Sequence, residues 1–444
     1  MKKNLSLILL SSIFFCCLSA CCNNNQQVKS KVKPGIEVLR DQNFSILKGK
    51  RVGLITNPTG VDSQLKSTID ILHEAEDVEL VALFAPEHGV RGDVYAGDHV
   101  DNTVDPRTGV PMYSIFGKTR KPTPEMLENV DVIVYDIQDI GCRSYTFIST
   151  MGMGMMAAAE NNKEFVVLDR PNPLGGNRIE GNLVEDDYIS FVSQFKIPYL
   201  YGQTPGELAL MLNEEGMLGE KCRLTVIPME GWTRNMTWDE TGLEWIPASP
   251  HIPYPQSAIY YPVTGILGEL YYINMGVGYP LPFQTIGAPW FNADSLATNL
   301  NALNLPGVRF RPIHYKPYYS TSKGELCGGV QIYITEYEKA RLTEIQFYVM
   351  QVIKEMYPHH DIFKEAPQNR FQMFDKVCGT NFIREKFSET YRWADVKDYF
   401  EKDEKAYREL SSKYYLYKPV GGIKIIISLL KSPRRGLMCL TACD

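Results

Sequence analysis

Residues 84–92 (F-A-P-E-H-G-V-R-G) place a carboxyl group, an imidazole and a guanidinium in one short loop. Glu87, His88 and Arg91 follow a largely apolar run at residues 78–84, which is typical of a strand buried on both faces. A proline and two glycines end regular structure there. A polar loop directly after a buried strand is often an active site, whereas the alternative is a surface turn with incidental charges.

These residue types suit glycoside hydrolysis. That reaction needs an acid to protonate the leaving oxygen and a second group that acts as nucleophile, as base or as stabiliser of the oxocarbenium ion. Glu87 is the best candidate acid, because the apolar strand before it favours the protonated carboxyl, with His88 or Arg91 tuning it. Asp136 or Asp139 is the candidate counter-carboxylate. An esterase or amidase is a rival, but no G-x-S-x-G motif of a serine enzyme is present.

The sequence around this loop predicts strands that alternate with helices along the chain. Apolar, β-branched runs predict strands at residues 51–56, 78–84, 131–136, 165–168 and 223–228. Between them we expect helices at residues 145–161 and 205–215, and a short one at 123–129 capped by Thr123. A further helix, capped by Asp62, would place Leu65, Ile69 and Leu72 on one face. This order predicts an α/β fold with a parallel sheet covered on both faces, a Rossmann-like N-terminal domain.

Polar clusters follow four of the predicted strands. Ligands bind at the carboxyl ends of strands in open parallel sheets, so four clusters in turn predict one shared site. Ordinary turns and caps are the alternative for any single cluster. The clusters contain Asn57, then Glu87, His88 and Arg91, then Asp136, Asp139 and Arg143, then Asp169 and Asn172.

A second, smaller α/β domain is predicted from His251 onward, with a cleft between it and the first. Residues 260–290 are dense in Gly, Pro, Tyr and Asn and are suited to wall that cleft. Helices are expected near 293–302, 342–356 and 404–415, and strands near 308–312 and 329–335. Trp290, Trp393 and most tyrosines are expected in the core or in interfaces rather than as sugar platforms.

Composition and the N-terminus set further limits. A net charge of −6 in 444 residues gives no basic footprint for nucleic acid. No G-x-G-x-x-G follows the first strand, no Walker loop occurs, and the cysteines form no C-x-x-C pairs, so we predict neither cofactor nor metal. Lys2 and Lys3 precede a short apolar run that ends in a sequence resembling a bacterial lipobox, L-S-A-C at residues 18–21. That resemblance implies cleavage before Cys21 and its lipidation, hence a lipid-anchored protein of the cell envelope on the periplasmic side or the cell surface.

The predicted organisation therefore has five parts. They are a signal peptide (1–20), a linker (21–33), the Rossmann-like catalytic domain (34–250), the C-terminal α/β domain (251–417) and an atypical tail (418–444).

Four long segments resemble the NamZ family of exo-β-N-acetylmuramidases. They are G-K-R-V-G-L-I-T-N-P-T-G (49–60), F-A-P-E-H-G-V-R-G (84–92), D-I-Q-D-I-G-C-R-S-Y-T (136–146) and D-R-P-N-P-L-G-G (169–176), within a likeness that runs over residues 35–417. The resemblance implies release of N-acetylmuramic acid from non-reducing ends of peptidoglycan fragments, without metal or nucleotide. It implies Glu87 as the catalytic acid and places cleft-lining positions on His88, Asn57, Asp136, Arg143, Asp169 and Asn172.

Two further expectations concern specificity. The lactyl carboxylate of muramic acid calls for a guanidinium, and Arg91 and Arg143 are the candidates, the alternative being that each orders its loop. Where many family members read E-G-T-N and G-R-G-T, this chain has E-L-Y-Y (269–272) and G-V-G-Y (276–279), retaining Glu269 as a candidate substrate-binding residue. These substitutions favour the rival hypothesis of a non-catalytic lipoprotein that binds cell-wall sugars.

Overall fold

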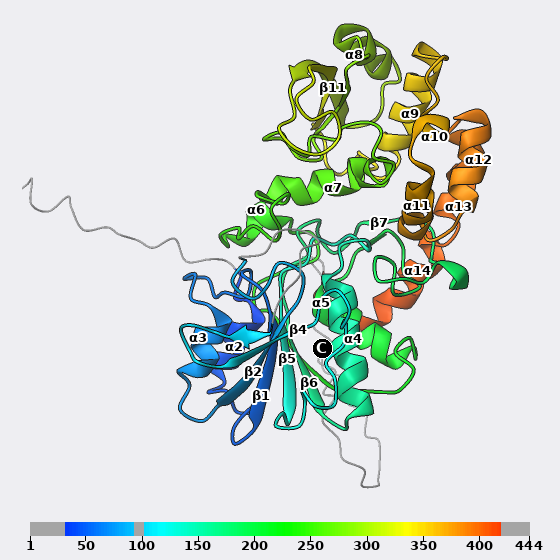
Figure 1. The fold of residues 1–444 in the computed structure, drawn as a ribbon. Helices are drawn as coiled ribbons and strands as arrows, with labels where there is room; N and C mark the ends of the chain where they lie inside the picture. Colours follow the sequence, from blue (N-terminus) through cyan, green and yellow to red (C-terminus); the bar gives the residue numbers. More distant parts are fainter. Residues whose placement is uncertain (1–31, 93–101, 419–444) are drawn as a thin grey trace, which may run out of the picture.

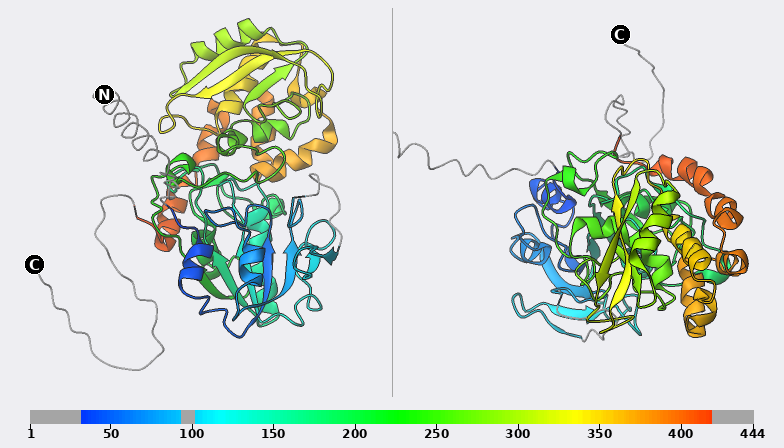
Figure 2. Two further views of the ribbon diagram at one scale, coloured as in Figure 1. Left: turned by 90° about the vertical axis from the view of Figure 1, so that its left-hand side faces the viewer. Right: turned by 90° about the horizontal axis from the view of Figure 1, so that it is seen from above.

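The computed structural model describes residues 32–92 and 102–418. The signal peptide, the lipobox with Cys21 and the tail after Lys418 lie outside the described residues. The described chain forms two stacked bodies, each with its own sheet (Figures 1 and 2).

The lower body contains a seven-stranded sheet in the order β3-β4-β2-β1-β5-β6-β9. Neighbouring strands are parallel except for the β3–β4 pair. The strand order reverses at β1, which is the point where ligands bind in open α/β sheets. The strands are β1 (Arg51–Thr56), β2 (Glu79–Ala85), β3 (Thr103–Val104), β4 (Pro111–Ser114), β5 (Val132–Asp136), β6 (Glu164–Leu168) and β9 (Arg223–Ile227).

Successive side chains of each strand point to opposite faces of the sheet, so the apolar side chains are divided between two cores. In β5, Val132 and Val134 pack on the side of α2 (Gly35–Asp41) and α3 (Thr68–His73). Ile133 and Tyr135 pack on the other side, with α4 (Phe147–Glu160) and α5 (Pro205–Glu214). The sheet is therefore a buried middle layer between helices on both faces (Figure 1), which confirms the predicted α/β class.

One predicted helix begins later than expected, and another does not form. Helix α3 begins only at Thr68, with Ser67 as its cap. Asp62 instead accepts hydrogen bonds from the backbone N–H groups of Gln64 and Lys66, which favours a turn over a helix. Leu65 there has φ 65° and is exposed. Residues 124–129 form turns, in which the Leu127 N–H donates to the backbone oxygens of Thr123 and Pro124.

The upper body holds a three-stranded antiparallel sheet in the order β10-β12-β11 (Figure 2, left). Its strands are β10 (Thr285–Ala288), β11 (Val308–Tyr315) and β12 (Cys327–Ile334), with α7 (Pro255–Gly268), α8 (Ala293–Ala302) and α9 (Ile345–Met356) packed around them. The sequence did not predict α7, because it contains Pro262, which normally argues against a helix interior. Helices α10 (Ile362–Glu365), α11 (Phe371–Cys378), α12 (Phe382–Thr390) and α13 (Ala394–Glu401) follow.

Helix α14 (Glu404–Ser411) leads the chain back to the lower body. Tyr407 packs in its core and donates a hydrogen bond to Gln203 Oε1 at 2.7 Å. Tyr417 donates to Asp169 Oδ2 at 2.5 Å and packs edge-on against Trp232. Smaller elements are α6 (Trp238–Thr241), the pair β7 (Ile179–Glu180) and β8 (Leu200–Tyr201), and 3-10 turns at Asp186–Tyr188, Gln368–Arg370 and Ser412–Tyr414.

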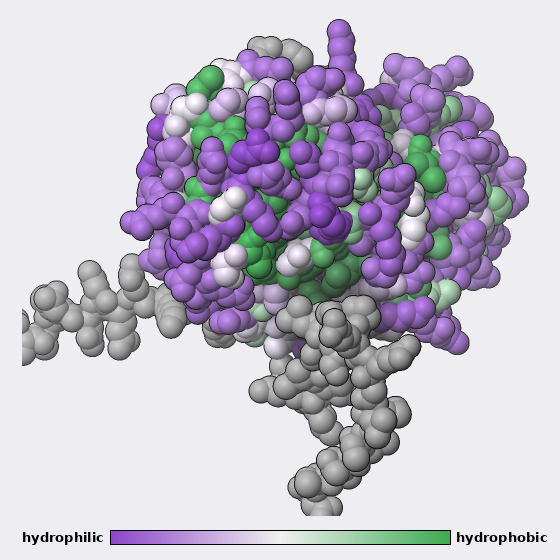
Figure 3. Space-filling view, turned by 90° about the horizontal axis from the view of Figure 1, so that it is seen from below, coloured by the Kyte–Doolittle hydropathy of each residue, from purple (hydrophilic) through white to green (hydrophobic). Residues whose placement is uncertain are grey.

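The surface seen from below is largely hydrophilic, with apolar residues in limited areas between polar ones (Figure 3). Among the described helices, none has the length and apolarity to cross a membrane. The four cysteines in the described ranges, Cys142, Cys222, Cys327 and Cys378, are buried and unbridged.

Candidate active site

Glu87 lies two residues after the end of β2, half-buried in the loop that the sequence singled out. The hydroxyl of Thr146 donates a hydrogen bond to Glu87 Oε2 at 3.3 Å. The next residue, His88, is buried and has φ 73°, a left-handed conformation that costs free energy for a residue with a side chain. Such backbone strain concentrates at functional sites, where the surrounding fold maintains it.

The loop faces the upper body. The ring of Tyr145, beside Thr146, meets the ring of Tyr261 on α7 edge-on, with centroids 5.8 Å apart. Burial lowers the pKa of His251, and its proximity to His88 lowers it further, which favours the neutral imidazole. Residues of both bodies therefore lie close to the loop that carries Glu87.

A cavity of about 220 Å³ lies in the upper body, and two of its lining residues, His251 and Tyr261, are those that approach His88 and Tyr145. Most of its lining comes from residues 260–290, the segment that was expected to wall a cleft between the domains. That inter-domain cleft stays a prediction. Tyr271 and Val277, where the chain departs from the usual family pattern, are part of the wall. Besides these two, the cavity is lined by His251, Tyr261, Glu269, Phe283, Tyr319 and smaller residues.

Glu269 faces this cavity as half of an ion pair. Arg370 donates from Nη2 to Glu269 Oε2 at 2.6 Å and from Nε to the Glu269 backbone oxygen at 2.9 Å. Burial raises the pKa of Glu269, and Arg370 offsets only part of that rise. Its role in substrate binding stays a prediction.

Asp136 does not face the cleft. Its Oδ1 accepts from Arg170 Nε at 2.5 Å, and its Oδ2 accepts from Arg170 Nη2 and from the Thr68 hydroxyl. The side chain is fully buried. We therefore correct the interpretation of Asp136 as a counter-carboxylate, because both oxygens are engaged in joining strand ends.

Asp139 is also buried, but only one of its oxygens is engaged. Oδ2 accepts hydrogen bonds from the Gly141 N–H and the Tyr201 hydroxyl, whereas Oδ1 has no partner among the described residues. Burial raises the pKa of Asp139 to about 7, against the lowering effect of those hydrogen bonds.

This shift predicts a pH-dependent stability. The folded protein keeps the Asp139 proton up to about pH 7, whereas the unfolded chain loses it near 3.8, so stability falls as pH rises between these values. Relative to Asp139→Asn, the parent is expected to lose about 1.4 kcal/mol of unfolding free energy per pH unit between pH 5 and 7. Urea denaturation at pH 5, 6 and 7 measures this, with Asp77→Asn as an exposed control. A pH-independent difference would contradict it.

The two predicted carboxylate-binding arginines have other partners. Arg143 is buried and donates to the backbone oxygens of Asn182, Ile197 and Val377, which favours the loop-ordering alternative. Arg91 pairs with Asp105 through two hydrogen bonds of 2.9 and 3.0 Å. Burial raises the pKa of Asp105, but bonds from Arg91 and Thr108 together lower it to about 2.

The remaining predicted residues hold the strand-end loops together. Asn57 Oδ1 accepts from the N–H and the hydroxyl of Thr59. Asn172 accepts from the Leu174 N–H and donates to the Gln203 backbone oxygen. Asp169 accepts from Thr204, Gly206, Arg170 and Tyr417. The structure thus brings the four clusters to one edge of the sheet, but it engages most of their polar groups in hydrogen bonds and ion pairs within the fold.

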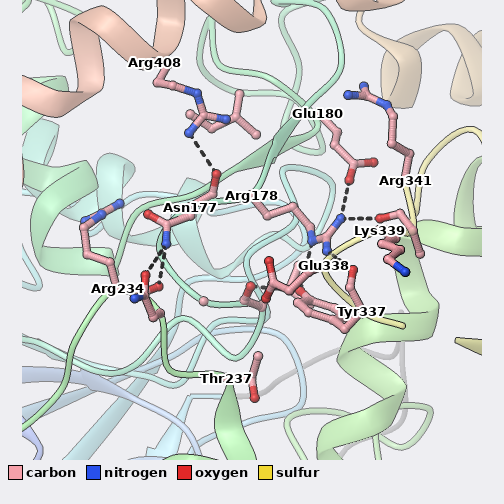
Figure 4. Close-up of a pocket in the computed structure, with 15 residues that line it drawn as sticks. Asn177, Arg178, Glu180, Arg234, Thr237, Tyr337, Glu338, Lys339, Arg341 and Arg408 are labelled. Atoms are coloured by element: carbon pink, nitrogen blue, oxygen red, sulfur yellow. Dashed lines mark hydrogen bonds and ion pairs between the residues drawn. The ribbon is translucent and has the colours of Figure 1, made fainter. Parts of the chain in front are cut away.

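A larger cavity, of about 540 Å³, lies elsewhere between the bodies (Figure 4). Arg178 crosses it and donates to the Tyr337 hydroxyl, the Tyr337 and Ala340 backbone oxygens, and Glu180 Oε1. Arg341 likewise pairs with Glu404. These contacts make the cavity a joint between the bodies, and none of the predicted site residues lines it.

Sequence reasoning did not name four of the residues that line the upper-body cavity as site residues: His251, Tyr261, Tyr271 and Tyr319. Tyr261 and Tyr271 lie in the segment that was expected to wall a cleft, but most tyrosines were expected in the core or in interfaces. His251 and Tyr319 come from segments without a recognisable motif. The described ranges contain no group of three His, Cys, Asp or Glu side chains arranged to hold a metal ion.

Comparison with known proteins relates this geometry to one family. The family model "Exo-beta-N-acetylmuramidase NamZ, N-terminal" matches residues 52–256, and the corresponding C-terminal model matches residues 259–417. The chain is 45% identical over 389 residues to the peptidoglycan β-N-acetylmuramidase NamZ of Bacillus subtilis (strain 168), covering 88% of this chain and 92% of that protein.

Two crystal structures of DUF1343 family proteins from Bacteroides fragilis NCTC 9343 share the fold. One has a TM-score of 0.85 and 64% identity, covering 88% of this chain and all of the other. The second has a TM-score of 0.69 and 28% identity, covering 87% and 99%. Since the two family models together match most of its length, this chain belongs to the NamZ family.

Proposed function

We propose that this protein is an exo-acting β-N-acetylmuramidase, a glycoside hydrolase that releases N-acetylmuramic acid from the non-reducing ends of peptidoglycan fragments. The observation that carries the proposal is the family match to both halves of the chain, and it is supported by the Glu87 loop, whose neighbours His88 and Tyr145 approach His251 and Tyr261 of the C-terminal half. The name of the Bacillus subtilis relative supports the same substrate.

In this proposal Glu87 protonates the leaving oxygen, and the Thr146 hydroxyl orients its carboxyl group. His88, Asp139 and Glu269 remain candidates for the second role, because Asp136 has no oxygen left for a substrate. The buried Arg170–Asp136 pair and Arg143 fix the loops that carry these groups.

The test is incubation of the protein with a muramic acid–glucosamine disaccharide, both sugars N-acetylated, followed by mass spectrometry of free N-acetylmuramic acid. A matched trisaccharide with an added N-acetylglucosamine at the non-reducing end serves as control. We expect release from the disaccharide only. Cleavage of both would contradict exo action, and binding without release would favour a non-catalytic sugar-binding lipoprotein.

We further propose that the protein is lipidated at Cys21 and held in the cell envelope by that anchor. The support is the lipobox-like sequence before Cys21, preceded by lysines and an apolar run. Cys21→Ser is expected to abolish incorporation of labelled palmitate and to move the protein out of the membrane fraction, whereas Cys22→Ser is expected to retain both. Equal labelling of the two variants would contradict this assignment.

A further inference from the structure

Two exposed tyrosines stand at the upper side of the active-site cleft. Tyr319, in the loop between β11 and β12, is 55% exposed, and Tyr271, after α7, is 53% exposed. Both line the 220 Å³ cavity, two other walls of which, His251 and Tyr261, approach the Glu87 loop at His88 and Tyr145. Large exposed aromatic side chains at a polar cleft mark a binding surface, because their rings offer apolar area next to hydrogen-bonding groups.

The loop that carries Tyr319 is fixed rather than free to swing. The backbone N–H of Tyr318 donates to the Gly278 oxygen at 2.8 Å, and Asn274 Nδ2 donates to the Thr321 oxygen at 2.8 Å. Gly278 has φ 84°, and a Cβ there would lie 2.1 Å from the Tyr319 backbone oxygen, so the loop sits directly on the glycine. Ordered backbone on both sides presents the ring in a defined position.

Each ring is also supported by a neighbouring side chain. The His251 ring stacks with that of Tyr319, with centroids 6.1 Å apart and planes 14° from parallel. The Arg370 guanidinium lies 4.1 Å from the centroid of the Tyr271 ring. More than half of each tyrosine stays exposed despite this support, which leaves ring surface for a ligand.

The charged groups around this cavity balance. Arg370 neutralises Glu269 at 2.6 Å, and His251 is held neutral by its lowered pKa at neutral pH. A carboxylate-bearing ligand would find no unpaired cation among these residues. An uncharged sugar ring, with a face of C–H groups and an acetamido group, matches both the neutral polarity and the room in the cavity.

Building on the proposed function, we propose that this cavity is the subsite for the leaving-group sugar and that Tyr319 and Tyr271 select an uncharged N-acetylated pyranose by stacking on its ring. The subsite lies on the leaving-group side of the glycosidic bond that is cleaved. It therefore selects the sugar to which the muramic acid is attached. It does not recognise the muramic acid itself, whose lactyl carboxylate the neutral cavity disfavours.

The test compares two substrates that share the muramic acid and differ in the leaving group. One is the N-acetylated muramic acid–glucosamine disaccharide, and the other is the β-azide of N-acetylmuramic acid, whose leaving group has no ring. Tyr319→Ala and Tyr271→Ala are each expected to lower kcat/KM about tenfold for the disaccharide, mainly through a higher KM. For the azide we expect kcat/KM to stay within about twofold of the parent value.

Matched controls separate stacking from other effects. Tyr318→Ala removes a neighbouring tyrosine that is 73% exposed and does not line the cavity, so we expect no change with either substrate. Tyr319→Phe keeps the ring and is expected to retain activity. Equal losses on both substrates, or no loss on the disaccharide, would overturn the proposal.

A binding measurement distinguishes failure of this subsite from failure of the proposed hydrolytic function. If the parent hydrolyses neither substrate, saturation-transfer NMR with methyl N-acetyl-β-glucosaminide tests the subsite directly. A saturation-transfer signal from the glucosaminide with the parent protein, lost with Tyr319→Ala, would support the subsite in a protein that binds sugar without hydrolysing it. Absence of that signal with the parent protein would overturn the proposed subsite.

Discussion

Replacement of Glu87 by glutamine is expected to lower kcat/KM for the disaccharide about 10³-fold, the scale of general acid catalysis. Glutamine keeps the shape of the side chain and can still accept from Thr146, but it has no proton to give to the leaving oxygen. The unfolding temperature should change little, since the half-buried carboxyl contributes only a 3.3 Å hydrogen bond from Thr146. Mass spectrometry of released N-acetylmuramic acid gives the rate.

Glu79→Gln provides a matched control, because it makes the same change at the exposed opposite end of strand β2. Its activity should equal that of the parent. Full activity of Glu87→Gln would place the acid on another residue while leaving the glycosidase function intact. A large drop in unfolding temperature would instead show that Glu87 supports the fold.

Arg170→Met is expected to lower the free energy of unfolding by about 3–5 kcal/mol. The substitution leaves the fully buried Asp136 carboxylate without its cation, with the Thr68 hydroxyl as its remaining described donor. It also removes the hydrogen bond from Arg170 to the Val61 backbone oxygen. Urea denaturation followed by circular dichroism measures the change.

Lys48→Met is the control for this second experiment. Lys48 pairs with Asp77 at 2.7 Å, but both side chains are more than half exposed, so we expect a loss below about 0.5 kcal/mol. If Arg170→Met costs as little as Lys48→Met, then Asp136 does not depend on its arginine. The carboxyl would then return as a candidate for the second catalytic role.

Local pattern was enough to predict most of the lower body. The apolar run of β1 predicted Arg51–Thr56 with its observed bounds, because parallel strands buried on both faces need continuous apolar sequence. Prediction failed where a side chain or a proline changes the local balance. Asp62 binds the backbone and turns the chain before α3, while the apolar packing of α7 outweighs its internal Pro262.

The site was predictable only in part, for a similar reason. Glu87 stands in a recognisable loop, and strand order alone brings it to the functional edge of the sheet. Asp136 has the same local setting, yet a contact with Arg170, 34 positions later, makes it structural. Tyr319 enters the cleft through tertiary packing more than 200 residues from Glu87, a distance over which the sequence carries no local signal.

The return of the chain to the lower body has a consequence for biosynthesis. Tyr407 packs into a core whose strands are synthesised much earlier, and the Tyr417 hydroxyl donates a hydrogen bond to Asp169, just after the end of β6. The nascent N-terminal half therefore leaves the ribosome with part of its core missing and a buried carboxylate short of one donor. The strands of its sheet are all made by residue 227, but these two contacts form only after residue 417 has been synthesised, so we expect the lower body to reach its full stability late in translation.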